Sequence, residues 1–288
     1  AAFGNATDDK TRAYYAETLP NPKLEVFPVR EVADIGRSLG VPLIMDNTAC
    51  PILCRPLDHG AAVTVYSTTK YIGGHGTSIG GLIVDGGNFD WEGNGERFPL
   101  LTTPDPSYHG AVWTEAVKPL GPIAYILKAR VTLLRDLGAC MSPFNAFLFI
   151  QGLETLSLRM REHSENAAKA ADWLSHQDKV KSVIYPGLMT GEAKRRADAY
   201  LSGGYGALIG FELKGGAESG QKFIDWLKTK PDSYFKLIKL KKGGTVVSIS
   251  DYLKQKEDIP IKKIDLASYF TPGKTLASLT DAEREVVN

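Results

Sequence analysis

The chain has no marked excess of either charge, few cysteines and no long apolar run. Its 288 residues include 34 Lys and Arg against 33 Asp and Glu, so charge gives no reason to expect nucleic acid or an anionic membrane as the main partner. Three cysteines are an odd number in a long chain and argue against a disulfide framework. No apolar run approaches the roughly 20 residues that span a bilayer, and the first residues lack a signal-peptide pattern. A cytoplasmic location is therefore expected.

What the chain does contain is the composition of a folded globular protein. It is 43% apolar and 23% charged, without an internal repeat or a low-complexity tract. This length allows one large domain or two ordinary ones.

Short apolar runs and a helical pattern alternate over the first 90 residues. A helix is expected over 29–39, where apolar residues recur at helical spacing before Gly40. Strands are expected at 12–18, 41–46 and 61–67. Continuous apolar strands in this order are typical of a parallel sheet covered on both faces. The apolar run 80–87 follows too closely for a crossover helix, which predicts an antiparallel strand. The expected fold is therefore α/β with a mixed sheet.

Helices are expected after residue 111, and the pattern changes again beyond residue 175. Helical patterns cover 111–137 and 144–175. Strand candidates at 180–187 and 206–213 then flank a polar helix, and 218–227 reads as a further helix. This order predicts a smaller α+β domain attached to the long helix. The Lys-rich stretch 228–263 has weak periodicity and receives no assignment.

Two charged residues lie at or just after the ends of the apolar strands. Lys70, in YSTTKYIGGHG, follows the third expected strand, and Asp46 closes VPLIMD. A desolvated lysine amine can condense with an aldehyde, and a carboxylate can hold a proton on a ring nitrogen. Taken singly, Lys70 suits a solvent-facing lysine and Asp46 suits a turn cap. Together they favour a site for an aldehyde cofactor.

Other motifs in the chain are weaker. Ser67 and Lys70 match S-x-x-K of penicillin-binding enzymes, but the partner motifs S-D-N and K-T-G are absent. The triplet beginning at Gly273 lacks the earlier glycine of a P-loop. Cys50 and Cys54 have no second Cys/His pair nearby, so core positions are expected and no metal site is predicted.

The sequence does not assign a role to two histidine-containing loops. His75, in GGHG, suits a turn as well as a ligand contact. Tyr108 and His109, in PDPSYHG, have the composition of an exposed loop that could line a site entrance.

Four segments resemble the Cys/Met-metabolism group of pyridoxal-phosphate (PLP) enzymes. They are ETLPNPKL, VPLIMDNT, YSTTKYIGGHGTSIGG and SPFNAFLFIQGLETLSLRMREHSENA. Within that group, DGGNFDW, then FP and PDPSYHG, is most similar to O-acetylhomoserine sulfhydrylases, also called O-acetylhomoserine aminocarboxypropyltransferases. The resemblance runs almost continuously from Phe3 to Leu227. It implies the aspartate aminotransferase-like fold (fold type I) of PLP-dependent transferases.

The resemblance implies a role for each matching position. Lys70 matches the lysine that binds PLP covalently, and Asp46 matches the carboxylate paired with the pyridine nitrogen. Ser67 and Thr69 match hydroxyls that bind the cofactor phosphate. Asn21 matches a residue near the ring hydroxyl.

The implied reaction is a γ-replacement in methionine biosynthesis. An amino-acid substrate, O-acetylhomoserine, and a sulfur donor, sulfide, give homocysteine and acetate. Cystathionine γ-synthase and methionine γ-lyase activities would share Lys70 and Asp46 and remain alternatives, as does a non-catalytic fragment or subunit. The resemblance also implies a homotetramer.

The chain departs from the family at both ends. Family members are longer, so we expect this chain to be truncated: 1–145 is the C-terminal part of the large PLP-binding domain, and 146–288 is the linking helix and an incomplete smaller domain. The portion before Ala1 would carry further phosphate contacts, and the arginine that binds the substrate carboxylate would follow Asn288. The 288 residues alone are therefore expected to show weak or no turnover.

Overall fold

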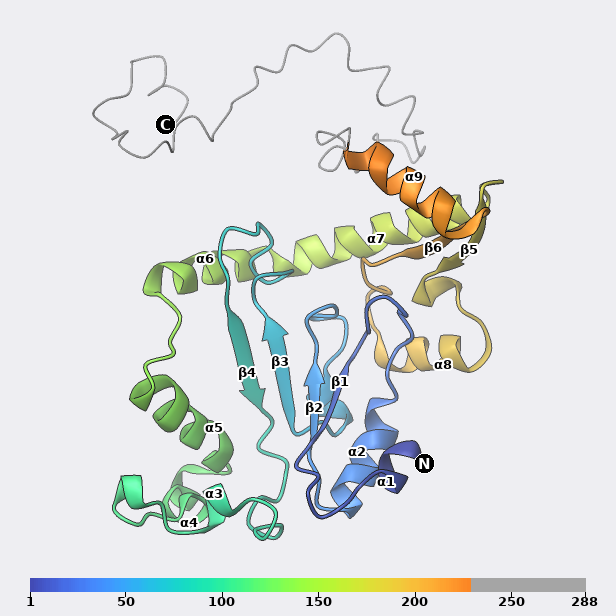
Figure 1. The fold of residues 1–288 in the computed structure, drawn as a ribbon. Coiled ribbons are helices and arrows are strands. Elements are labelled where there is room, and N and C mark those ends of the chain that lie inside the picture. Colours follow the sequence, from blue (N-terminus) through green and yellow to red (C-terminus); the bar gives the residue numbers. More distant parts are fainter. Residues whose placement is uncertain (229–288) are drawn as a thin grey trace, which may run out of the picture. The chain divides into compact units, whose positions relative to one another are not determined.

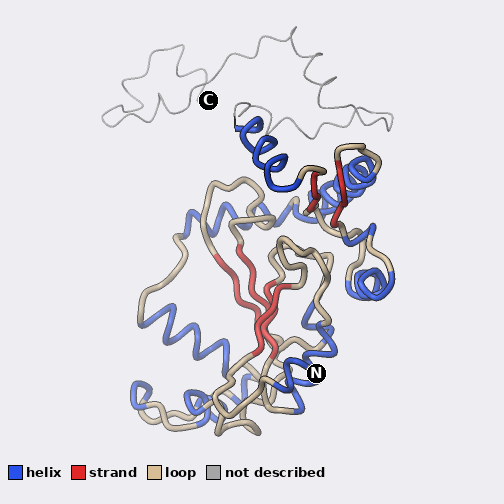
Figure 2. The backbone as a smooth tube through the Cα atoms, turned by 45° about the vertical axis from the view of Figure 1, so that its right-hand side comes forward, coloured by secondary structure: helices blue, strands red, loops and turns tan. Residues whose placement is uncertain are grey.

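Four strands form the main sheet in the part of the chain that the computed structural model describes, residues 1–228. The strands are β1 (Tyr14–Glu17), β2 (Leu43–Asp46), β3 (Val63–Ser67) and β4 (Gly81–Asp85), and they lie side by side in that order (Figures 1 and 2). The first three are parallel and β4 is antiparallel to β3. The mixed sheet and the direction of the run after Lys70 are thus confirmed. The Lys-rich stretch lies outside the described residues beyond Lys228.

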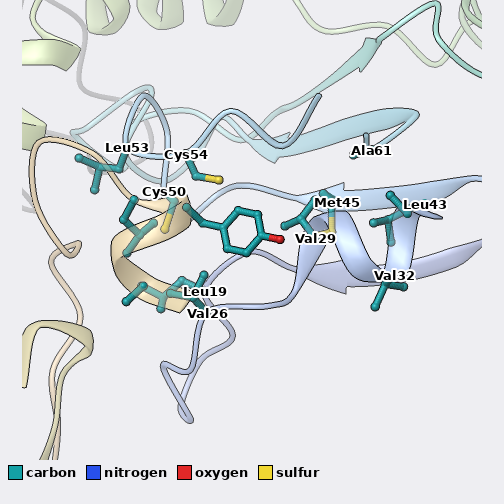
Figure 3. Close-up of a cluster of buried hydrophobic side chains, with 14 of the residues drawn as sticks. Leu19, Val26, Val29, Val32, Leu43, Met45, Cys50, Leu53, Cys54 and Ala61 are labelled. Atoms are coloured by element: carbon teal, nitrogen blue, oxygen red, sulfur yellow. The ribbon is translucent and has the colours of Figure 1, made fainter. Parts of the chain in front are cut away.

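Helix α2 (Val29–Ser38) covers one face of this sheet, next to the short helix α1 (Ala2–Asn5). It buries Val29, Val32 and Ala33, as the helical spacing predicts, and Gly40 follows it with φ of +66°. Alternate residues of β1 and β2, among them Leu43 and Met45, meet α2 in the main apolar cluster (Figure 3).

The opposite face of the sheet is partly exposed within residues 1–228. Tyr15 on β1 is 58% exposed, and Ile83, on the same face of the edge strand β4, is 44% exposed. The described residues therefore meet the expectation of a sheet covered on both faces only in part, because Val63 on this face is buried whereas Tyr15 and Ile83 are not.

The predicted helix over 111–137 forms only in pieces. The chain instead contains four short helical segments: α4 (Trp113–Ala116), η3 (Lys118–Leu120), α5 (Ala124–Ala129) and the π-helical η4 (Arg130–Asp136). Gly121 has φ of +105° and precedes Pro122, a combination that an α-helix does not accommodate. With α3 (Pro99–Thr102), these segments bury a second cluster around Trp91 and Trp113.

The second predicted helix divides at Thr155 into α6 (Pro143–Glu154) and α7 (Leu156–Ser175). The Ser142 hydroxyl accepts a hydrogen bond from the Asn145 N–H and caps the start of α6. Figure 1 shows α6 beyond the ends of β3 and β4, with α7 continuing from it towards β5 and β6. None of the helices in residues 1–228 is long and apolar enough to cross a membrane.

Beyond α7, the two predicted strands form as β5 (Val180–Ile184) and β6 (Gly210–Leu213). They pair antiparallel. The polar helix α8 (Gly191–Tyr200) lies between them in sequence, and α9 (Gly216–Lys228) follows β6. Tyr200 and Ala197 of α8 are buried in the main apolar cluster. The 145/146 domain boundary stays a prediction.

Candidate active site

The strand register brings the predicted site residues to one edge and one face of the sheet. Glu17 pairs with Asp46, and Asp46 pairs with Val65, at the carboxyl ends of three parallel strands. Paired residues point to the same side of a sheet, and Ser67 lies two positions beyond Val65. Asp46 and Ser67 therefore face the same space, and Lys70 follows in the turn after β3.

These residues line one cavity of about 710 Å³. Lys70, Asp46, Ser67 and Asn21 all contribute to its wall. The remaining lining residues come from the same strand ends, from the loop after Lys70, from α7 and from the segment before β6: Glu17, Thr48, Ala49, Tyr71, Gly74, Gly76, Arg159, His163 and Leu208. Four of the five predicted site residues thus share one cavity.

The turn that carries Lys70 is built from backbone hydrogen bonds. The Lys70 N–H donates to the Ser67 carbonyl at 3.2 Å, and the Lys70 carbonyl accepts from the Gly74 N–H at 2.8 Å. The Gly73 N–H donates to the Thr68 carbonyl at 2.8 Å. The Lys70 side chain is exposed among residues 1–228, as its spacing alone suggests.

The Asp46 carboxylate is oriented by two donors. One oxygen accepts from the Thr48 N–H at 2.9 Å and the other from the Tyr15 hydroxyl at 3.1 Å. The Thr48 hydroxyl in turn accepts from the Ser67 N–H at 2.7 Å. Burial and the Asp46 charge raise the pKa of Tyr15, so this phenol stays a donor. The ends of β2 and β3 are thereby fixed to each other beside Lys70.

Thr69 differs from the other predicted residues. Its hydroxyl accepts from the Gly80 N–H at 3.1 Å, and it lines a neighbouring cavity of about 630 Å³. The neighbouring cavity shares Gly76 and Arg159 with the first and also includes His75. The Asn21 backbone N–H donates to the Glu17 carboxylate at 3.3 Å.

Sequence reasoning missed two ionisable residues of α7 at this site. Arg159 and His163 both line the Lys70 cavity. The His163 ring meets Tyr71 edge to face at 5.7 Å, and burial, with the Arg159 charge next, lowers the pKa of His163. Their spacing of four residues on an amphipathic helix is a signal, but only the fold shows which way that helix faces.

Other candidate residues lie away from this cavity. Cys50 and Cys54 are buried in the main apolar cluster, where burial raises the pKa of the Cys54 thiol to about 12 (Figure 3). This confirms them as core residues. Tyr108 and His109 do not line the Lys70 cavity. The Tyr108 hydroxyl instead donates to Asp136 at 2.7 Å.

The model of the Cys/Met metabolism PLP-dependent enzyme family matches residues 1–232. The chain belongs to this family. An O-acetyl-L-homoserine sulfhydrylase of Leptospira meyeri is 52% identical over 233 residues, which are 78% of this chain and 52% of that protein. A homocysteine synthase of Schizosaccharomyces pombe is 46% identical over 223 residues, 77% of this chain and 51% of that protein. The chain spans about half the length of the curated relatives it matches.

A solved structure supports the same family fold. It is a Campylobacter jejuni protein assigned as an O-acetylhomoserine (thiol)-lyase, with N'-pyridoxyl-lysine-5'-monophosphate at one position. It aligns with a TM-score of 0.67 at 35% identity and covers 73% of this chain and 51% of its own. The fold type I expectation is confirmed.

The side chains at the cavity fit the family's cofactor. An amine, a carboxylate, a hydroxyl and an amide from Lys70, Asp46, Ser67 and Asn21 suit an aldehyde, a ring nitrogen, a phosphate and a ring hydroxyl. The Ser67 hydroxyl and the side-chain amide of Asn21 have no hydrogen-bond partner within residues 1–228. These two groups are therefore available to a ligand.

Proposed function

We propose that the complete protein is a PLP-dependent sulfhydrylase. It replaces the acetate group of O-acetylhomoserine by sulfide and releases homocysteine and acetate. The observation that carries the proposal is the single cavity that collects Lys70, Asp46, Ser67 and Asn21 in a member of this family. The names of the two relatives, sulfhydrylase and homocysteine synthase, support this choice of substrate and product.

Each residue has a distinct task in this proposal. PLP, when bound, supplies a ring that takes up the electron pair left on the substrate Cα. Lys70 would hold the cofactor covalently and, as a tethered amine at high effective concentration, would move protons at the substrate Cα and Cβ. Asp46, oriented by Tyr15 and Thr48, holds a proton on the ring nitrogen. Ser67 donates a hydrogen bond to the phosphate.

Thr69 and Asn21 complete the cofactor contacts. Asn21, in the loop after β1, would hold the ring hydroxyl. The Thr69 hydroxyl contributes to the phosphate site when it exchanges its bond to Gly80 for one to phosphate. We expect the small-molecule substrate and the sulfur donor to bind in the same cavity.

Substrate profiling of the native protein tests the proposed reaction. Sulfide-dependent consumption of O-acetylhomoserine, with acetate released in equal amount, is the expected result. Release of methanethiol from methionine, or of cystathionine in place of homocysteine when cysteine is supplied, would instead assign one of the sister activities.

A Lys70→Ala variant tests whether the cavity is catalytic at all. It should lose both turnover and the visible absorbance of bound PLP, whereas Lys169→Ala, which changes an exposed lysine on α7, should keep both. A colourless wild-type protein would indicate a non-catalytic subunit.

We also infer a cytoplasmic homotetramer. The family resemblance supports the tetramer. The three free cysteines, of which two are buried without a disulfide, support the cytoplasmic location. Light scattering of the native protein measures the assembly, and a dimer or monomer would contradict it.

A further inference from the structure

The Arg159 guanidinium binds the backbone of the loop that follows Lys70. Its Nη1 donates to the Tyr71 carbonyl at 2.7 Å, and its Nη2 donates to the Ile72 carbonyl at 3.2 Å. Nη2 also donates to the Gly152 carbonyl at 2.6 Å, near the end of α6. A single side chain on α7 therefore joins the α6 backbone to the loop that follows Lys70, residues 70–74, which we call the catalytic loop.

The loop also touches α6 directly. A Cβ added at Gly152 would lie 2.3 Å from the Ile72 carbonyl oxygen, so only glycine permits this approach. Gly74 has φ of +74°, and a Cβ there would lie 2.7 Å from the Arg159 Nη1. The glycines thus leave room for both the helix and the guanidinium.

The donors of Arg159 are almost all engaged. Its Nε donates to the Thr155 hydroxyl at 3.0 Å, which brings the number of hydrogen bonds to four. A guanidinium has five N–H groups, so one remains for a ligand. An arginine that binds a carboxylate in the bidentate way needs two. Although Arg159 lines the cavity, its geometry does not suit a substrate clamp.

We propose that Arg159 is a positioning residue, whose guanidinium fixes residues 70–74 against α6 and thereby sets where the Lys70 amine lies. The Lys70 carbonyl accepts from Gly74 N–H inside this same turn, so a displacement of the turn moves the lysine with it. A displacement of about 1 Å at a reacting group can cost about 100-fold in rate. The catalytic consequence rests on the proposed function, whereas the structural role does not.

The test compares Arg159→Gln and Arg159→Lys with Arg161→Gln, a change of the exposed arginine two positions on. The first measurement is amide hydrogen exchange at Gly73 and Gly74 in the native protein freed of PLP. Both Arg159 variants should exchange about tenfold faster there, because an ammonium cannot span the carbonyls that a planar fork reaches. Arg161→Gln should leave the exchange unchanged.

The second measurement separates positioning from substrate binding in the holoenzyme. Arg159→Gln should lower kcat by about 10- to 100-fold and change KM by less than about threefold. A raised KM at unchanged kcat would make Arg159 a substrate contact, and full recovery in Arg159→Lys would show that charge alone matters. Either result overturns the proposal.

A milder variant keeps the test open if Arg159→Gln does not fold. Thr155→Val removes one of the four bonds and should raise the exchange at Gly73 and Gly74 about two- to tenfold. Unchanged exchange in all three variants would contradict the proposal even in an active enzyme. If the wild type lacks turnover and colour, the proposed function fails, and the exchange data still decide the role of Arg159.

Discussion

Replacing Gly152 by alanine tests the contact between α6 and the catalytic loop. The new Cβ would lie 2.3 Å from the Ile72 carbonyl oxygen and 2.9 Å from that of Gly73. An ordinary carbon–oxygen contact is about 3.3 Å or longer, so the loop must retreat by about 1 Å or the helix must shift. We therefore expect Gly152→Ala to move the Lys70 turn.

The expected change in stability is the difference between two effects. Alanine is favoured over glycine in a helix by about 1 kcal/mol. Overpacking of a close contact costs about 1–3 kcal/mol. The free energy of unfolding should accordingly fall by up to about 2 kcal/mol, and kcat should fall by about 100-fold because Lys70 is displaced.

Gly220→Ala in α9 is the matched control, because a Cβ there meets no atom within 4 Å. It should stabilise its helix by up to about 1 kcal/mol and leave kcat unchanged. Urea unfolding and steady-state kinetics measure both variants. If Gly152→Ala behaves like Gly220→Ala in both assays, the helix does not constrain the loop and the reasoning fails.

Three further outcomes follow from contacts elsewhere in the chain. Thr48→Val leaves the Ser67 N–H without its acceptor and should lower the free energy of unfolding by about 1–3 kcal/mol in urea titrations. At about pH 8, iodoacetamide should label the exposed Cys140 and spare Cys54 until the protein unfolds, because burial raises the pKa of Cys54 to about 12; equal labelling would contradict its burial. Burial, and then a hydrogen bond to a glutamate, raises the pKa of Tyr200 to about 12. Since unfolded tyrosine ionises near pH 10, stability should fall as pH rises from about 10 to 12, and Tyr200→Phe should flatten that part of the urea-midpoint profile.

The strand ends that form the site could be predicted from the sequence, because each is marked by a short apolar run followed by a polar residue. Asp46 and Lys70 each follow an apolar run, and the distance from Lys70 to the next run correctly predicted an antiparallel β4. Parallel pairing then brings residues far apart in sequence to the same edge. The motif around Lys70 predicted the chemistry of the site. The strand register showed that Asp46 and Ser67 lie close together beside it.

The other features of the fold and the site depend on contacts between residues far apart in the sequence, which local patterns do not predict. Arg159 reaches the Tyr71 carbonyl across 88 positions of sequence, so no spacing rule connects the two. The helical pattern over 111–137 failed because Gly121 and Pro122 interrupt it, although the apolar residues around them keep helical spacing. The cavity wall beside Lys70 likewise depends on how α7 faces the strand ends, which the spacing of residues along one helix does not show.

Borohydride reduction of the PLP-loaded native protein, followed by peptide mass spectrometry, tests the central claim most directly. The reduction makes the link between the cofactor and its lysine permanent. We predict one phosphopyridoxyl group per chain, on the peptide that contains Lys70, and none in Lys70→Ala. A modified lysine elsewhere in the chain, or no modification, would contradict the assignment of this cavity as a PLP site.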